Sequence, residues 1–306
     1  MNDLSYLVKP KNTPIYIIRD EKRNNVIYLK DETNQYTNAF KYRGVYNKFS
    51  KCKYLNSYNG VVTASTGNHG QAVAFAAKQL GIKCVIFVPK TTPLKKIKKI
   101  KNFDAVIYKR KIYNYDFAKS QALKFAEKNN YFYISSFDDM DIIQGHMSLF
   151  NEVNMLPIDY CFCPVGGGGL VSAAIKSLKA KVIGVELEGN DAMNKSLLSK
   201  RLENIKLSVS EKNMFCEGIL VSEVGKIPFE IALENNLQVN LVNIEDIKNA
   251  IRILSNYNIF AEGAGASSLA GYLKSDIKNS TVLCIISGGN IDDSVLNLIM
   301  EERIWK

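Results

Sequence analysis

The stretch Val165-Gly166-Gly167-Gly168-Gly169-Leu170 joins an apolar run of strand length, residues 160–165, to a helical pattern that begins near Leu170. A strand, a glycine turn and a helix in this order leave backbone N–H groups at a helix N-terminus, where the helix dipole also favours an anion. A tight turn alone needs fewer glycines, so the run favours phosphate binding over a purely structural turn. The stretch lacks the Gly-x-Gly-x-x-Gly pattern with a following acid and the Walker Lys-Ser/Thr, which disfavours dinucleotide and triphosphate ligands.

Strand-length apolar runs alternate with helical patterns on both sides of this stretch. An opening hairpin is predicted at 15–19 and 26–30, where two such runs flank a polar turn. The later runs are separated by helical patterns and lie at 84–88, 105–108, 131–134, 160–165, 182–186, 237–242 and 282–286. Strands separated by helices form βαβ units and parallel sheets, so the sequence predicts the α/β class.

The length of 306 residues suits two lobes, because single hydrophobic cores stop growing at about 250–300 residues. No long linker or low-complexity segment marks a boundary between them. We therefore predict a discontinuous large domain, residues 1–59 and 138–306, which contains the glycine stretch. A small domain, residues 60–137, is inserted into it and carries a polar loop.

The composition, 46% hydrophobic and 23% charged, is typical of a globular protein in water. No apolar run approaches the roughly 20 residues that span a bilayer, and the N-terminus lacks a secretory signal pattern. The six cysteines follow no disulfide framework, which suits buried thiols in a reducing compartment. Cys161 and Cys163 have no second pair with histidine nearby, so we expect no metal site. These features predict a cytoplasmic protein that does not bind a membrane.

A net charge of +10 raises nucleic acid as a partner. Lysines are densest at 95–101, where Ile97 and Ile100 lie three positions apart between them. This spacing predicts an amphipathic helix with a solvated basic face. No nucleic-acid-binding motif accompanies the helix, so we expect no nucleic acid partner.

Three further phrases carry groups with chemical potential. Lys41, in Asn38-Ala39-Phe40-Lys41-Tyr42-Arg43-Gly44, would be a surface residue if taken alone. Near an apolar neighbour and a bound aldehyde it could form a Schiff base, because a desolvated lysine loses its proton more readily. The phrase Ser65-Thr66-Gly67-Asn68-His69-Gly70-Gln71 opens a helix with polar groups, which is typical of an ordinary N-cap or of an anion-binding loop. Ser287-Gly288-Gly289-Asn290 follows the last predicted strand and supplies a hydroxyl.

Taken together, the four phrases resemble the fold type II family of pyridoxal phosphate enzymes, and within it the threonine and serine dehydratase and serine racemase group. The resemblance runs from Lys30-Asp31-Glu32-Thr33 to Ser287-Gly288-Gly289-Asn290-Ile291-Asp292. It implies a two-lobed α/β fold in which each lobe has a parallel-rich sheet flanked by helices. It also implies pyridoxal 5'-phosphate as the cofactor, a small amino acid as the substrate and a homodimer.

The resemblance assigns a role to each matching position. Lys41 becomes the Schiff-base lysine and catalytic base, Phe40 lies beside the cofactor ring, and Ser287 meets the pyridine nitrogen. Asn68 becomes the partner of the cofactor's phenolic oxygen. The phosphate is assigned to the backbone of Gly166, Gly167, Gly168, Gly169 and Leu170, and two further cofactor-pocket positions are Gly218 and Glu262. The substrate carboxylate is assigned to Ser65, Thr66, Gly67, Asn68 and His69.

The chemistry implied is β-elimination from a hydroxy amino acid such as L-threonine or L-serine, which yields a 2-keto acid and ammonia. A serine at the ring nitrogen makes the ring a weaker electron sink than a carboxylate would, which favours elimination over transamination. Two alternatives use the same intermediate, an amino-acid racemase and a β-replacement synthase. Thr66 is the second catalytic candidate, because a hydroxyl on the ring face opposite Lys41 could return a proton. A noncatalytic binding protein is disfavoured by the intact Lys41.

The chain departs from the group's pattern at two places. Where the group has Gly-Gln-Gly-Thr, an aliphatic run and a glutamate, this chain has His146 for the threonine and Phe150 for the glutamate. The group's divalent-cation site uses a glutamate and an aspartate six residues later. Glu186 matches the first, but the second position is Ala192. Asp191, beside it, is the alternative second ligand, but we expect no tightly bound metal.

Overall fold

The computed structural model describes residues 4–65, 67–90, 92, 94–109, 111–112, 115–208, 210 and 213–302. The chain divides into two compact units, each continuous in space but not in sequence. The first unit comprises Met1–Lys11 and Lys41–His146, and the second comprises Asn12–Phe40 and Met147–Lys306. Each unit has its own sheet.

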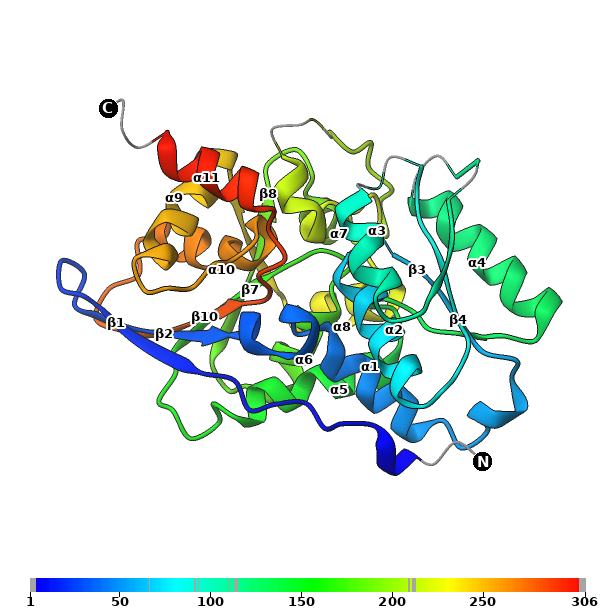
Figure 1. The fold of residues 1–306 in the computed structure, drawn as a ribbon. Coiled ribbons are helices and arrows are strands. Elements are labelled where there is room, and N and C mark those ends of the chain that lie inside the picture. Colours follow the sequence, from blue (N-terminus) through cyan, green and yellow to red (C-terminus); the bar gives the residue numbers. More distant parts are fainter. Residues whose placement is uncertain are drawn as a thin grey trace. The chain divides into compact units, whose positions relative to one another are not determined.

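The second unit is built on a six-stranded sheet of order β1-β2-β10-β7-β8-β9 (Figure 1). Its antiparallel hairpin is the predicted one, and all other neighbouring pairs are parallel. The parallel α/β prediction is thereby confirmed. The strands are β1 (Ile15–Asp20), β2 (Asn25–Asp31), β7 (Tyr160–Pro164), β8 (Lys181–Leu187), β9 (Gln238–Val242) and β10 (Thr281–Ile286).

Helices follow the strands of this sheet and bury them. In Figure 1, α9, α10 and α11, coloured gold to red, lie together beside β10 and β7. The ring of Tyr272 on α10 meets Phe162 of β7 edge to face, with ring centroids 6.0 Å apart. The helices are α6 (Gly169–Ser177), α7 (Ala192–Ser199), α8 (Lys226–Glu234), α9 (Ile244–Ser255), α10 (Gly263–Leu273) and α11 (Asp293–Glu301), with short 3₁₀ helices at Glu32–Asn34, Tyr36–Asn38 and Met214–Ile219. Two further 3₁₀ helices, Leu4–Tyr6 and Leu55–Ser57, belong to the first unit.

The first unit has a four-stranded parallel sheet of order β5-β4-β3-β6. Its strands are β3 (Val61–Ala64), β4 (Cys84–Phe87), β5 (Val106–Tyr108) and β6 (Phe132–Tyr133), and its helices are α1 (Lys41–Lys51), α2 (Asn68–Gln79), α3 (Leu94–Lys101) and α4 (Tyr115–Asn129). The sequence pattern missed β3, because its four residues include small and polar ones and run directly into the polar loop. All four residues are nevertheless buried.

The first unit extends beyond the inserted segment 60–137, to α1 on one side and to His146 on the other. α1 packs against α2, where the rings of Tyr42 and Phe75 lie 5.2 Å apart. α5 (Met140–Asn151) contains the second division point, and its first turns belong to this unit. Helix packing therefore places Lys41 in the same unit as the polar loop.

The lysine-rich segment forms the amphipathic helix that the sequence predicts. This helix is α3, in which Ile97 and Ile100 are buried and Leu94 is exposed.

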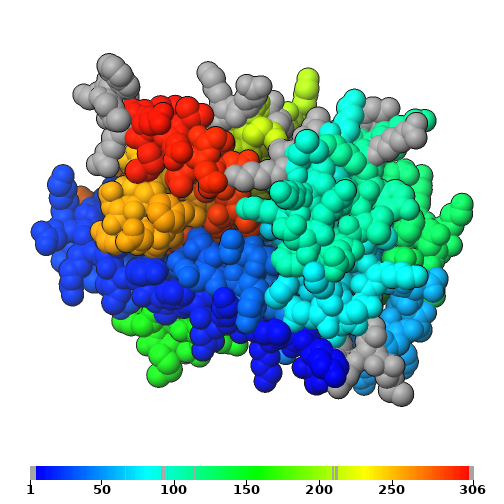
Figure 2. Space-filling view, in the orientation of Figure 1, coloured from blue at the N-terminus to red at the C-terminus, as the bar shows by residue number. Residues whose placement is uncertain are grey.

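Figure 2 shows α11 in red beside α9 in gold on the second unit. There Glu302 accepts hydrogen bonds from Lys248 at 2.9 Å and Arg252 at 3.3 Å, contacts that add little stability at an exposed surface. No helix in the described part of the chain has the length and apolarity needed to cross a bilayer.

Gly145→Ala tests the close crossing of α1 and α5. An added Cβ would lie 2.4 Å from the carbonyl oxygen of Arg43 and 2.6 Å from the Cα of Gly44, both backbone atoms of α1. Overpacking costs about 1–3 kcal/mol, against a helix-propensity gain of about 0.5–1 kcal/mol. We expect a net loss of about 1–2 kcal/mol in the free energy of unfolding, measured by urea titration.

The control is Gln144→Ala, at the neighbouring exposed position, which should change the unfolding free energy by less than about 0.5 kcal/mol. Equal stability of Gly145→Ala and the wild type would contradict the close crossing.

Candidate active site

The glycine loop, residues 166–170, connects the end of β7 to the first turn of α6. Gly168 is the N-cap of α6 and has a left-handed φ of +92°. As a glycine it offers no side chain to cap the first turn, whose N–H groups have no acceptor within the helix. Backbone hydrogen bonds hold the loop, from Val165 N to Val185 O at 2.9 Å and from Gly225 N to Gly167 O at 3.0 Å. The loop therefore presents backbone donors at the positive end of a helix, as a phosphate requires.

Close protein neighbours require glycine at two positions of the loop. A Cβ on Gly166 would lie 2.3 Å from the carbonyl oxygen of Gly218, and one on Gly168 would lie 2.6 Å from Cβ of Pro228. Gly218 belongs to the short helix Met214–Ile219, so the structure brings this predicted position directly onto the loop. Glycine at position 166 therefore lets the backbones of the loop and of the short helix approach closely.

Ser287 follows β10, the strand beside β7 in the sheet. Its side chain is buried, and its carbonyl oxygen accepts a hydrogen bond from Phe40 N at 3.0 Å. Glu262 N donates to Gly288 O, also at 3.0 Å. Phe40, Glu262 and Ser287 therefore meet at the carboxyl end of β10, next to the strand that leads into the glycine loop. Ligands of parallel α/β sheets bind at this end of the strands.

Lys41 is the first residue of α1 and lies in the first unit. Its Nζ donates a hydrogen bond to the carbonyl oxygen of Ser136 at 2.9 Å. Desolvation lowers the pKa of Lys41 to about 8. About a tenth of the amine is thus neutral at pH 7, far more than for an ordinary lysine, and the neutral amine is the state that can attack an aldehyde or accept a proton.

In the polar loop before α2, one side chain forms hydrogen bonds with the backbone of the loop and of the helix that follows. Ser65 Oγ accepts hydrogen bonds from Gly67 N at 3.2 Å and from Gly70 N at 2.9 Å. The hydroxyl thus caps the first turn of α2. This structural role was the alternative to ligand binding in the interpretation of the sequence. Asn68 begins α2, and Thr66 lies outside the described residues.

His69 is buried, and its Nε2 lies 3.3 Å from the carbonyl oxygen of Ile134. Since a carbonyl only accepts, this contact assigns the proton to Nε2. Nδ1 then carries a lone pair and has no hydrogen-bond partner among the residues that the structure describes. Burial, then the charge of Lys41, lowers the pKa of His69 to about 3. A neutral ring with this tautomer does not donate to a carboxylate from Nδ1, which favours the backbone of the loop for that task.

His146 is the second of the chain's two histidines, and it too is buried in the first unit. Its ring lies over Gly44 of α1, where an added Cβ would come within 2.5 Å of Cε1. Burial lowers the pKa of His146 well below its usual value, and the charges of Lys41, His69 and Arg43 lower it further. The sequence marked His146 only as a departure from the group's pattern, and neither its place near Lys41 nor the Ser136 carbonyl was expected.

The carboxyl group of Glu186 caps the N-terminus of a helix. Its Oε1 accepts from Met193 N at 2.9 Å and its Oε2 from Asn194 N at 2.8 Å, both in the first turn of α7. Burial outweighs these hydrogen bonds and raises the pKa of Glu186 to about 8. Asp191 pairs with Lys195 at 3.1 Å. Within the described ranges, no three His, Cys, Asp or Glu side chains are grouped to hold a metal ion.

Comparisons with known proteins identify the family of the chain. The family model "Pyridoxal-phosphate dependent enzyme" matches residues 8–288. An L-threonine ammonia-lyase of Thermotoga maritima is 38% identical over 94% of this chain and 73% of its own. The chain belongs to the pyridoxal-phosphate dependent enzyme family, as its four phrases predicted.

Solved structures give the same result. Threonine deaminase isoform 2 of Solanum lycopersicum, in its processed form, superposes with a TM-score of 0.83 at 32% identity, over 98% of this chain and 90% of that one. Serine racemase of Dictyostelium discoideum superposes with a TM-score of 0.81 at 32% identity, over 92% and 94%. The protein is therefore a pyridoxal-phosphate enzyme of the α/β class.

Gly166→Ala tests the cradle. The new Cβ would press on a backbone oxygen, so the loop must shift and its N–H groups would lose their alignment. We expect pyridoxal phosphate affinity to fall at least about tenfold, equivalent to about 1.4 kcal/mol, in a fluorescence titration of the apoprotein. Ser177→Ala, at the other end of α6, should leave the affinity unchanged. Equal affinities for Gly166→Ala and the wild type would contradict the cradle.

The lowered pKa of Lys41 predicts a pH dependence. Only the neutral amine attacks the cofactor's aldehyde, and its fraction falls about tenfold for each pH unit below the pKa. The rate of covalent capture by the apoprotein, followed by absorbance, should rise with pH and level off above about 8. After borohydride reduction, peptide mapping should find the label on Lys41. Lys48 is the internal control, because Asp139 and Asp141 raise its pKa. A rate that still climbs steeply near pH 10, or a label on Lys48, would refute the assignment.

Proposed function

We propose that this protein is a pyridoxal-phosphate-dependent ammonia-lyase that eliminates water from L-threonine or L-serine, after which a water molecule hydrolyses the resulting imine to a 2-keto acid and ammonia. The observation that carries the proposal is Lys41, an amine with a pKa lowered to about 8 and held on a backbone carbonyl at the start of α1. The names of the relatives support the same reaction class, since the Thermotoga maritima protein is an L-threonine ammonia-lyase.

The residues of this chain divide the work of the reaction. When bound, pyridoxal phosphate withdraws electrons from the substrate's α-carbon. Lys41 would carry the cofactor and then take the α-proton, because its lowered pKa makes the neutral amine more abundant near neutral pH than that of an ordinary lysine. The glycine loop would hold the phosphate with N–H groups at the start of α6. Phe40 would lie beside the ring, and Gly218 would hold the loop in place.

The polar partners of the ring would set the outcome. Ser287 at the pyridine nitrogen is a neutral hydroxyl and, unlike a carboxylate, does not keep that nitrogen protonated. Negative charge at the α-carbon would then be short-lived, which favours loss of the β-hydroxyl over transamination. Asn68 would bind the phenolic oxygen, and Glu262 would line the pocket from the start of α10.

The substrate's carboxylate would bind at the loop from Ser65 to His69, mainly through backbone N–H groups at the start of α2. The hydroxyl of Ser65 is already a cap acceptor, and the Nδ1 of His69 is a lone-pair acceptor. We further propose, from the family resemblance, that the enzyme is a cytoplasmic homodimer.

The test is to incubate the holoenzyme with L-threonine and L-serine and to measure 2-keto acid, ammonia and D-amino acid. We expect keto acid and ammonia in equal amounts and little D-amino acid. Adding a thiol with O-activated serines would reveal thioether if the enzyme were a β-replacement synthase. Abundant D-product or thioether without keto acid would overturn the proposal.

Thr66→Ala distinguishes a lyase from a racemase. The racemase is the second candidate because the Dictyostelium discoideum neighbour is a serine racemase. Elimination needs one base, so keto acid formation should survive within about tenfold. Racemisation needs a second proton donor, whose loss costs about 10² to 10⁴-fold.

A further inference from the structure

Two residues shortly before Lys41 have a left-handed backbone. Thr37 has a φ of +61° and a ψ of +17°, and Asn38 has a φ of +55°. Asparagine tolerates this region, whereas a β-branched residue such as threonine rarely adopts it, because its Cβ crowds the backbone. The Oγ1 of Thr37 is also buried, and it has no hydrogen-bond partner in the part of the chain that the structure describes. Thr37 therefore costs the folded state free energy that its own side chain does not recover.

The loop that follows β10 holds this left-handed turn. Asn290 Nδ2 donates a hydrogen bond to Thr37 O at 2.8 Å, and Gly289 N donates one to Asn38 O at 2.9 Å. Asn290 is itself buried. A right-handed or extended backbone at Thr37 would turn its carbonyl group away from the loop. The amide of Asn290 therefore stabilises the left-handed conformation over the alternatives.

The pairing between the two segments continues from this turn toward Lys41. Ala39 pairs with Gly288 in an antiparallel bridge, and Phe40 N donates to Ser287 O at 3.0 Å. Phe40 and Ser287 are the residues assigned to the cofactor ring, and Lys41 follows Phe40 directly. Consecutive Cα atoms are about 3.8 Å apart, so this pairing also limits where the backbone of Lys41 can lie.

The loop is a firm support because it is packed on another side as well. A Cβ on Gly289 would lie 2.6 Å from the carbonyl oxygen of Phe260 and 3.0 Å from the Cβ of Thr33. The loop thus has little room to follow Thr37 if the turn relaxes. A strained backbone that its surroundings hold in place is typical of functional sites.

We propose that Asn290 is a positioning residue for the Schiff-base lysine. Its amide holds the carbonyl of Thr37, which keeps the turn left-handed and sets the direction in which the chain runs into Lys41. The proposal rests on the proposed role of Lys41 as the residue that carries the cofactor. Misplacing an attacking group slows its reaction much more than it weakens binding of the partner. Loss of the Asn290 hydrogen bond therefore slows the attack of Lys41 and spares noncovalent binding at the glycine loop.

The first test separates covalent capture from noncovalent binding. In capture by the apoprotein, the amine of Lys41 and the aldehyde of pyridoxal phosphate form a C=N bond and release water. Asn290→Ala should lower the limiting rate of capture, followed by absorbance at saturating pyridoxal phosphate, at least about tenfold. Pyridoxine 5'-phosphate has an alcohol in place of the aldehyde. Its affinity, measured by fluorescence titration, should change by less than about threefold.

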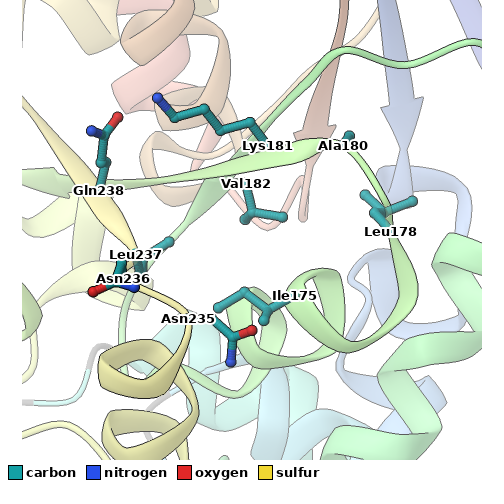
Figure 3. Close-up of a pocket in the computed structure, with 9 residues that line it drawn as sticks. All are labelled: Ile175, Leu178, Ala180, Lys181, Val182, Asn235, Asn236, Leu237 and Gln238. Carbon is teal, nitrogen blue, oxygen red and sulfur yellow. The ribbon is translucent and has the colours of Figure 1, made fainter.

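The matched control is Asn235→Ala. Asn235 Nδ2 donates to the carbonyl oxygen of Ile231 at 2.8 Å, which is the same kind of hydrogen bond at the same length. Asn235 follows α8 and lines the pocket shown in Figure 3, near the amino end of β9 and away from the loop that follows β10. Asn235→Ala should leave both the capture rate and the affinity within about threefold of the wild type.

Thr37→Asn tests the strain. Added to Asn290→Ala, it should raise the capture rate at least about threefold, because asparagine tolerates the left-handed region. Thr37→Val keeps the branched Cβ and removes only the hydroxyl, so it should not raise the rate. As a single change, Thr37→Asn should raise the urea midpoint of unfolding, a readout that remains if Asn290→Ala fails to fold.

Equal capture rates in Asn290→Ala and the wild type would overturn the positioning role. Losses of capture rate and of pyridoxine 5'-phosphate affinity by the same factor would also overturn it, because they would indicate general damage to the pocket. Equal rescue by Thr37→Val, or no gain in the urea midpoint with Thr37→Asn, would overturn the part played by strain. A borohydride-fixed label on another lysine of the wild type would instead overturn the proposed role of Lys41, so the two failures are distinguishable.

Discussion

The approach of two glycine backbones, Gly166 and Gly218, is the constraint on which the second unit's site depends. With 2.3 Å between a Cβ on the first and the oxygen of the second, no side chain fits there. The same device recurs beside it, since a Cβ on Gly265 would lie 2.2 Å from Gly288 O. Both contacts lie at the carboxyl ends of β7 and β10. Close backbone packing thus leaves backbone groups rather than side chains at this end of the sheet.

In the first unit, desolvation sets the charge states of the buried titratable side chains. Burial removes water from Lys41, His69 and His146 together, and their charged forms would repel one another in the same region. The histidine rings stay neutral at physiological pH, so the amine of Lys41 is the group that changes charge there. The carbonyl of Ser136 orients that amine without supplying a negative charge, so it does not restore the usual pKa. A carboxylate in that position would have kept the lysine protonated and inactive.

Much of the fold could be predicted from the sequence because hydrophobic periodicity and glycine punctuation are local signals. They located the hairpin, the parallel strands and the turn at 166–170. The same signals failed for β3, whose four residues are too few and too mixed to show a period. They also failed for Ser136, which acts through its backbone carbonyl, and backbone groups leave no trace in residue identity. The contact of His146 with Gly44 depends on how closely two helices cross, a property of tertiary packing.

Glu186 is a buried carboxyl group whose structural role is to cap a helix. Both of its carboxylate oxygens accept hydrogen bonds from the first turn of α7, where a helix N-terminus attracts negative charge. Its pKa of about 8 nevertheless shows that burial costs the charged form more than these donors return. Ala192, six residues after Glu186, supplies no oxygen ligand, and the neighbouring Asp191 pairs with Lys195. A helix cap is the stable use of a single buried carboxylate, whereas a divalent cation needs several oxygen ligands to replace its water.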